Sequence, residues 1–102
     1  MTSQLRTISR QAVPILKRAG VKRSSIFGSA ARGELKKKSD VDFLVELKKG
    51  SSLFDLAGLK LDLEDAIGRS VDLVTFRSLS PLIREKVLGE QVPILWRSQV
   101  FF

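Results

Sequence analysis

The sequence has 102 residues, enough for one domain with a small core and too few for two domains of ordinary size. It contains no cysteine and no histidine, which excludes disulfides, thiolate metal sites and acid–base chemistry by imidazole. Without these residues, any metal chemistry must be carried by carboxylates, which suit hard ions such as Mg²⁺. The formal charge is +7. No apolar run approaches the roughly 20 residues of a membrane span, and the first ten residues lack the apolar segment of a signal peptide. We therefore expect a single cytoplasmic domain over residues 1–102.

The positive charge is concentrated in the first third of the chain. Residues 1–38 hold ten Lys or Arg and one acid, a net charge of +9, whereas residues 39–102 hold eight bases and ten acids, a net charge of −2. This segment is either a solvated basic face or a surface for an anion, such as a triphosphate or a nucleic acid. Charge alone does not separate these interpretations.

The first elements are predicted to be a helix and a strand. Residues 4–19 carry apolar side chains at helical spacing, and Gly20 is a plausible end. Pro14 lies inside this helix, so we expect it to kink the helix or split it in two. Residues 24–28 follow as a short strand that ends in glycine.

The middle of the chain predicts two strands with a helix between them. Residues 41–47 alternate apolar and other side chains with the period of a strand, and residues 71–76 read as another strand. Ser52 and Asp55 have the spacing of a capping box at the start of a helix, and Gly68 is a plausible end. One face of this helix is apolar and predicted to be core: Leu56, Leu59, Leu63, Ala66 and Ile67.

The last third of the chain predicts one more helix. Ser80 is expected to cap it, with Pro81 at its first position, and Leu82, Ile83 and Val87 are its expected core residues. Residues 92–96, VPILW, are expected to add a short edge strand, and the final RSQVFF matches no pattern. The order α-β-β-α-β-α predicts an α/β or α+β fold, a small mixed β-sheet packed with about four helices.

Asp40 and Asp42 are the first candidates for chemistry. Residues i and i+2 of a strand point to the same face, about 6.6 Å apart, so both carboxylates point the same way if the strand begins by residue 40. Such a pair repels unless a cation lies between its members. The alternative is structural, with Asp40 capping a turn and Asp42 on a solvated face.

Asp72 is the third candidate carboxylate. It lies between Val71 and Leu73 and therefore points away from both. It is either the exposed position of a half-buried strand or, if this strand neighbours residues 41–47, a third carboxylate on the same face as Asp42. Three carboxylates in proximity suit one or two Mg²⁺ ions.

The segment after the first strand is a candidate phosphate site. Gly28 allows the backbone to approach a phosphate closely, and the N–H groups and hydroxyl that follow, at Ser29, can donate to phosphate oxygens. The alternative is an ordinary turn. Arg32 either pairs with phosphate or braces acidic residues of the motif.

These residues together resemble a known family. Gly28-Ser29, the ten residues 30–39 and then Asp40-Val41-Asp42 have the order and spacing found in the minimal nucleotidyltransferases of the DNA polymerase β superfamily. Asp72 matches that family's third carboxylate, which lies on a later strand. The resemblance covers roughly residues 5–95 and implies a polymerase-β-type nucleotidyltransferase core.

The resemblance also implies a role for each residue. Gly28, Ser29 and Arg32 would hold the triphosphate of ATP. Asp40 and Asp42 would bind Mg²⁺, and Asp72 would complete the metal site and help activate the acceptor hydroxyl. Nucleotidyl transfer depends mainly on positioning and charge neutralisation, so it does not require a histidine.

The acceptor remains open at this point. A core of this size has little room to bind an acceptor. Free-standing members of the family resemble the antitoxins of HEPN/MNT toxin–antitoxin pairs, which adenylylate their HEPN ribonuclease toxin. The resemblance thus implies a HEPN-family partner. One alternative is an antitoxin that binds its partner or a nucleotide without turnover. Another is an enzyme acting on RNA or a small molecule, which is less favoured because most of the seven aromatic residues are core candidates.

Overall fold

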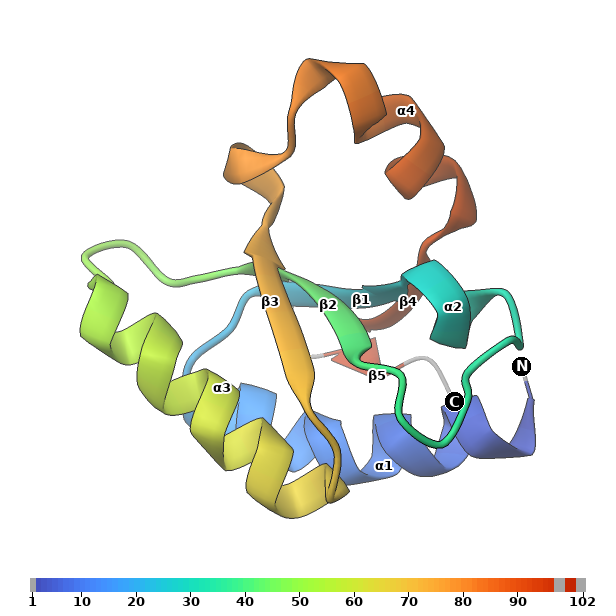
Figure 1. Cartoon of the computed structure of the whole chain (residues 1–102). Coiled ribbons are helices and arrows are strands. Elements are labelled where there is room, and N and C mark those ends of the chain that lie inside the picture. Colours follow the sequence, from blue (N-terminus) through green and yellow to red (C-terminus); the bar gives the residue numbers. More distant parts are fainter. Residues whose placement is uncertain (1, 97–98, 101–102) are drawn as a thin grey trace.

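The computed structural model describes residues 2–96 and 99–100, and it contains one β-sheet with helices on both faces (Figure 1). The first helix and the helix between Ser52 and Gly68 are predicted correctly within two residues at both ends, and the last helix begins at Pro81 as predicted. A short helix, α2, begins at the Gly-Ser pair. In chain order the elements are α1 (Ser3–Arg18), β1 (Arg23–Phe27), α2 (Gly28–Ala31), β2 (Val41–Glu46), α3 (Leu53–Ile67), β3 (Val71–Thr75), the 3₁₀ turn η1 (Phe76–Ser78), α4 (Pro81–Glu90), β4 (Val92–Trp96) and β5 (Gln99–Val100).

The sheet is mixed, as predicted, with the strand order β3-β2-β1-β4-β5. β2 and β3 are parallel and are joined through α3, whereas the other neighbouring pairs are antiparallel. The prediction that residues 92–96 form an edge strand is wrong, because β4 lies between β1 and β5. Ile94 and Leu95 are both almost fully buried, which shows that β4 is covered on its two faces.

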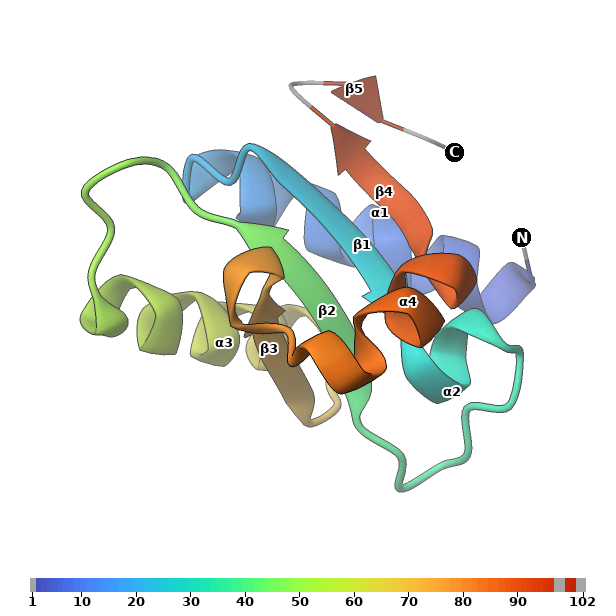
Figure 2. The same ribbon diagram turned by 90° about the horizontal axis from the view of Figure 1, so that it is seen from above.

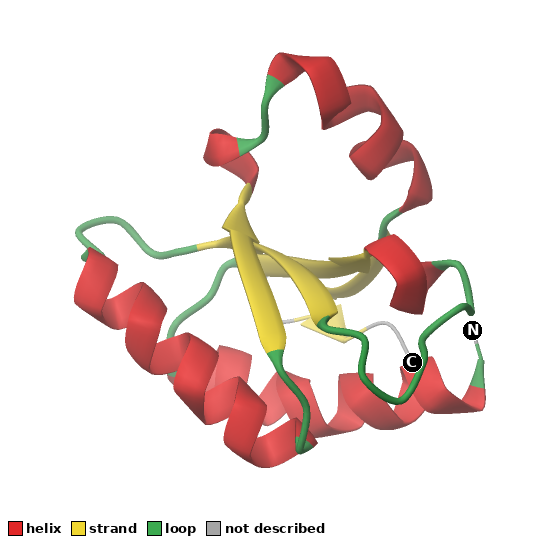
Figure 3. Ribbon diagram, viewed as in Figure 1, coloured by secondary structure: helices red, strands yellow, loops and turns green. Residues whose placement is uncertain are grey.

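The main core lies between the sheet and the layer formed by α1 and α3 (Figure 3). The period of two in β2 directs Val41, Phe43 and Val45 into this layer, where all three are fully buried. The capping box of Ser52 and Asp55 and the left-handed Gly68 bound α3 as predicted. No helix within the described part of the chain is long and apolar enough to cross a bilayer.

The prediction that Pro14 kinks the first helix or splits it in two is wrong as to the split, because α1 runs unbroken from Ser3 to Arg18. Pro14 lies on the exposed side of α1, four residues after the exposed Arg10. The carbonyl that loses its helical partner there can be solvated by water, and the adjacent Ala12, Val13 and Leu16 remain buried in the core.

The opposite face of the sheet carries a second, smaller core beneath η1 and α4 (Figure 2). It consists of Leu44, Phe76, Leu79 and Val87. Of the three core residues predicted for α4, only Val87 is correct. Leu82 is 95% exposed and Ile83 is 49% exposed, because the first turn of α4 stands away from the sheet and only the later turns reach it (Figure 1).

The C-terminal hexapeptide is only partly described. Gln99–Val100 forms β5, which pairs with β4 through Leu95 and Trp96. Arg97, Ser98, Phe101 and Phe102 lie outside the described residues.

Candidate active site

Asp42 and Asp72 lie side by side on neighbouring strands. The parallel register of β2 and β3 pairs Val41 with Val71 and Asp42 with Asp72. Both valines are buried in the core, so both aspartates point to the opposite face, the one that carries α4. Neighbouring strands are about 4.8 Å apart. The predicted proximity of the second and third carboxylates is therefore present in the fold.

Asp40 lies one residue before β2 and is exposed, while Asp42 is half-buried. Burial raises the pKa of Asp42 to about 6, and the negative charges of Asp72 and Asp40 add to this effect. Arg32 opposes it, as a positive charge that lowers the same pKa. The three predicted carboxylates are thus electrostatically coupled, and Asp42 is the centre of the coupling.

The chemistry of these side chains fits a hard divalent cation. They offer only oxygen donors, and they crowd negative charge around a half-buried Asp42. Among the residues that the structure describes, however, no three carboxylates already lie close enough together to bind one ion. The metal assignment of Asp40, Asp42 and Asp72 therefore stays a prediction.

Gly28 brings the Gly-Ser turn into contact with Asp42. Phe27, the last residue of β1, pairs with Asp42 in the antiparallel register of β1 and β2, so the next residue begins its turn beside this carboxylate. Gly28 has a φ of +69°, and a Cβ atom at this position would overlap the Asp42 carboxylate. Glycine is therefore required both by the backbone conformation and by the space. Ser29 follows at the start of the partly exposed segment α2.

Arg32 is bound by two carboxylates. Its Nε donates to Glu34 at 2.9 Å, and its Nη1 donates to Glu90 at 3.2 Å. Both acids lie outside the Asp-x-Asp pair, so the expected bracing of the motif's own acids is not what this arrangement shows. A contact between Arg32 and phosphate remains a prediction.

Glu90 is a residue of the site that sequence reasoning missed. It is the last residue of α4, and its carboxylate accepts hydrogen bonds from Arg32 and from the backbone N–H of Gly28, the latter at 3.3 Å. Its charge also contributes to the raised pKa of Asp42. No local pattern identifies it, since 62 residues separate it from Gly28 and only the packing of α4 beside α2 brings it there (Figure 2).

The matched family accords with this geometry. The family model of the nucleotidyltransferase domain matches residues 8–93, which include all the residues described above. The chain belongs to the nucleotidyltransferase domain family. It is accordingly a nucleotidyltransferase, with the mixed sheet expected of the polymerase β superfamily.

Two relatives of this nucleotidyltransferase are similar over most of their length. One, from Methanocaldococcus jannaschii, bears the provisional name protein adenylyltransferase; it is 50% identical over 88 residues, covering 86% of this chain and 95% of the relative. The other, protein adenylyltransferase MntA of Thermococcus cleftensis, is 44% identical over 75 residues, covering 74% of this chain and 76% of the relative.

Solved structures show the same fold. A structure described as a minimal nucleotidyltransferase has a TM-score of 0.77 and 44% identity, covering 87% of this chain and 91% of that one. A toxin–antitoxin structure with AMP-PNP has a TM-score of 0.76, covering 86% of this chain and 73% of that one. The second match has only 22% identity and supports the fold alone.

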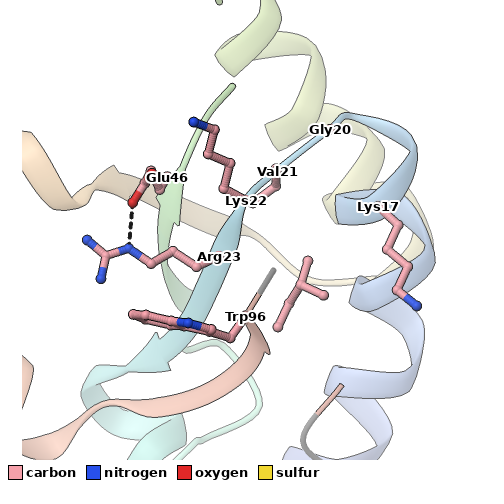
Figure 4. A pocket seen from close by; sticks show the side chains of 8 residues that line it. Lys17, Gly20, Val21, Lys22, Arg23, Glu46 and Trp96 are labelled. Carbon is pink, nitrogen blue, oxygen red and sulfur yellow. Dashed lines mark hydrogen bonds and ion pairs between the residues drawn. The ribbon is translucent and has the colours of Figure 1, made fainter. Parts of the chain in front are cut away.

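A pocket of about 880 Å³ lies at the other end of the sheet from the nucleotidyltransferase carboxylates. Figure 4 shows the side chains that line it, among them Arg23, Glu46 and Trp96. Arg23, which lines it, pairs with Glu46 at the end of β1 opposite to Phe27 and Asp42. Its guanidinium donates to Glu46 at 2.7 Å and lies over the rings of Phe76 and Trp96, with centroids at 3.9 and 4.9 Å. These contacts stabilise one end of the central strands. The pocket lies about four strand residues away from Asp42.

We predict that Asp42→Asn stabilises the metal-free nucleotidyltransferase at neutral pH. Because the pKa of Asp42 rises to about 6 on folding, the folded protein holds this proton more tightly than the unfolded chain. The protonated Asp42 carboxyl therefore contributes fully to the stability of the fold below a pH of about 3.9, the ordinary pKa of aspartate. This contribution is lost as the pH rises through about 6. After a discount for the solvent exposure of Asp42, the variant should gain about 1 kcal/mol at pH 7.5 and almost nothing at pH 4.

Thermal unfolding in a chelating buffer at the two pH values measures this difference. Asp62→Asn is the matched control, because Asp62 is exposed on α3, on the other side of the sheet. A gain for Asp42→Asn that is equal at pH 4 and pH 7.5 would contradict the electrostatic explanation.

Proposed function

We propose that this enzyme transfers AMP from ATP, with Mg²⁺, to a hydroxyl group of a partner protein. The observation that carries the proposal is the side-by-side placement of Asp42 and Asp72, with the Gly28 turn in contact with Asp42. Nucleotidyl transfer needs a group that binds metal and a group that binds phosphate. The carboxylates supply the first, and the adjacent backbone turn, which admits only glycine, supplies the second.

The carboxylates are proposed to hold the metal. Asp40 and Asp42 are two residues apart, and Asp72 is the register partner of Asp42. Modest rotations of the exposed Asp40 and Asp72 side chains would bring their oxygens toward the half-buried Asp42. Bound Mg²⁺ would neutralise charge on the triphosphate and make the acceptor hydroxyl more acidic. Asp72 is exposed on the edge strand β3, where an acceptor can approach it and where its carboxylate can receive the hydroxyl proton.

The Gly-Ser turn is proposed to hold the triphosphate. The Gly28 and Ser29 N–H groups and the Ser29 hydroxyl would donate to phosphate oxygens, and Arg32 would pair with phosphate after leaving its present partners. The acceptor oxygen would bond to the α-phosphorus as the bond to the β-phosphate breaks, with pyrophosphate as the leaving group. ATP as the donor is supported by the two relatives named protein adenylyltransferase.

The acceptor is proposed to belong to a HEPN-family toxin, which makes this protein the antitoxin of a cytoplasmic pair. A complex described as the tri-AMPylated HEPN toxin of Shewanella oneidensis with its MNT antitoxin contains a chain of the same fold, with a TM-score of 0.70 and 19% identity. The relative from Thermococcus cleftensis bears the name MntA, which is also part of the name of a toxin–antitoxin structure of the same fold, MntA-HepT. Residues 2–96 and 99–100 form one sheet with flanking helices and no separate acceptor lobe among them, and a partner protein is proposed to present the acceptor.

Calorimetric titration with ATP tests the metal part of this proposal. Wild-type protein should bind ATP in the presence of Mg²⁺ and much more weakly in a chelating buffer, because the triphosphate otherwise meets several uncompensated carboxylates. Asp40→Asn and Asp42→Asn should each weaken binding with Mg²⁺ by at least about tenfold.

Asp62→Asn again serves as the control, since it removes the same charge from α3. It should leave the affinity unchanged. Equal ATP affinity in wild type, Asp40→Asn and Asp42→Asn would rule out these residues as metal ligands.

A further inference from the structure

Glu90 occupies the part of the site where the proposed function places phosphate. Its Oε1 accepts from the Gly28 N–H at 3.3 Å and from Arg32 Nη1 at 3.2 Å, and its Oε2 accepts from the same Nη1 at 3.3 Å. Gly28 and Arg32 are two of the three residues proposed to bind the triphosphate. A carboxylate and a phosphate both present anionic oxygens to such donors, so they cannot use the same hydrogen atoms together.

The position of Glu90 is electrostatically unfavourable apart from these contacts. It ends α4, where the helix dipole disfavours a negative charge, and α4 has no basic residue in its last turn. Its charge also adds to the repulsion that raises the pKa of Asp42. Arg32 and the Gly28 N–H are therefore the groups that hold Glu90 in place, and its side chain is 20% exposed and has a route to solvent.

The way α4 is anchored allows the Glu90 side chain to leave Arg32 and Gly28 without disturbing the main core. Of the ten residues of α4, only Val87 is buried, and it packs in the small cluster beneath η1 rather than in the core of α1 and α3. A change of side-chain rotamer at Glu90, or a small displacement of the last turn, would release Arg32 and Gly28.

We propose that Glu90 is an internal competitor of the nucleotide: in the free enzyme its carboxylate holds Arg32 and the Gly28 N–H, and the triphosphate binds by displacing it. This inference rests on the proposed function, because it assumes that Gly28 and Arg32 bind phosphate. It assigns Glu90 a role in setting nucleotide affinity and no part in the transfer of AMP. A structural brace for Arg32 would have the opposite effect, since its removal would weaken nucleotide binding.

Calorimetry with Mg²⁺ and ATP, inorganic tripolyphosphate or adenosine distinguishes the two roles. Glu90→Gln should bind ATP and tripolyphosphate about threefold to tenfold more tightly than wild type, because a competing charge has been removed. Adenosine, which has no phosphate, should bind both proteins equally. Glu85→Gln is the matched control, because it removes the same charge from an exposed position of the same helix and should change no affinity.

Glu90→Asp provides a second variant should Glu90→Gln fold poorly. It keeps the charge but shortens the side chain by one methylene, so it should also tighten ATP binding, by a smaller factor. Unchanged or weaker ATP binding in folded Glu90→Gln, with wild type binding normally, would overturn the competitor role alone. If no protein binds ATP or tripolyphosphate, the nucleotide site itself is wrong and both proposals fail.

Discussion

Replacing Asp72 with asparagine should abolish transfer of AMP while most of the ATP affinity remains. Asp72 is exposed on the edge strand β3, beside Asp42 but farther from the Gly28 turn, which contacts Asp42 directly. Its proposed contribution is to the acceptor side of the reaction, where charge develops in the transition state. We therefore expect transfer to fall by at least about 100-fold and the Kd for ATP to change by less than about threefold.

Mass spectrometry of a co-expressed HEPN-family partner measures the transfer. After incubation with ATP and Mg²⁺, each modified hydroxyl should add about 329 Da, the mass of AMP less water, as expected for metal-assisted nucleotidyl transfer. This mass should be absent with Asp72→Asn and present with Asp62→Asn, whose substitution lies on α3, away from the site.

Two results would redirect the assignment. If the partner is silenced without modification, and equally well by the Asp72→Asn protein, the chain acts by binding and not by catalysis. If labelled AMP is recovered on RNA instead of protein, the acceptor is a nucleic acid.

Substitutions of Gly28 should have the next largest effect, the loss of nucleotide binding. Valine at this position would need a φ near +69°, which a β-branched residue almost never adopts, and its Cβ would overlap the Asp42 carboxylate. Both the proposed phosphate turn and a proposed metal ligand would shift. We expect no measurable ATP binding by calorimetry for Gly28→Val, whereas Ser29→Ala should lose only about 1–2 kcal/mol, for one charge-assisted hydrogen bond.

A matched pair of alanine variants separates the effect on ATP binding from the effect on the stability of the fold. Gly28→Ala should weaken ATP binding strongly, because its Cβ would also displace the Asp42 carboxylate. It should destabilise the fold by at least about 1–2 kcal/mol, the usual penalty for a left-handed alanine. Gly58→Ala makes the same chemical change within α3, where a Cβ would meet nothing within 4 Å. It should leave binding unchanged and raise stability by about 0.5–1 kcal/mol. Normal ATP binding by folded Gly28→Val would place the triphosphate elsewhere.

The local features of this protein could be read from the sequence because they depend on short-range backbone geometry. The period of two in residues 41–46 already placed Asp42 opposite to Val41 and Phe43, and the capping box at Ser52 and Asp55 marked the start of α3. The spacing from Gly28-Ser29 to Asp40 identified the family. Each of these signals lies within about 15 residues of chain, so it needs no knowledge of tertiary packing.

The tertiary structure decided which distant residues meet. The parallel pairing of β2 and β3 through α3 put Asp72 beside Asp42, and a shift of one residue in that register would have turned Asp72 into the core. The way α4 crosses the sheet left Leu82 in solvent and brought Glu90 to Gly28 and Arg32 across 62 and 58 residues of sequence. Such contacts depend on the whole arrangement of strands and on the closure of long loops, which no local periodicity encodes.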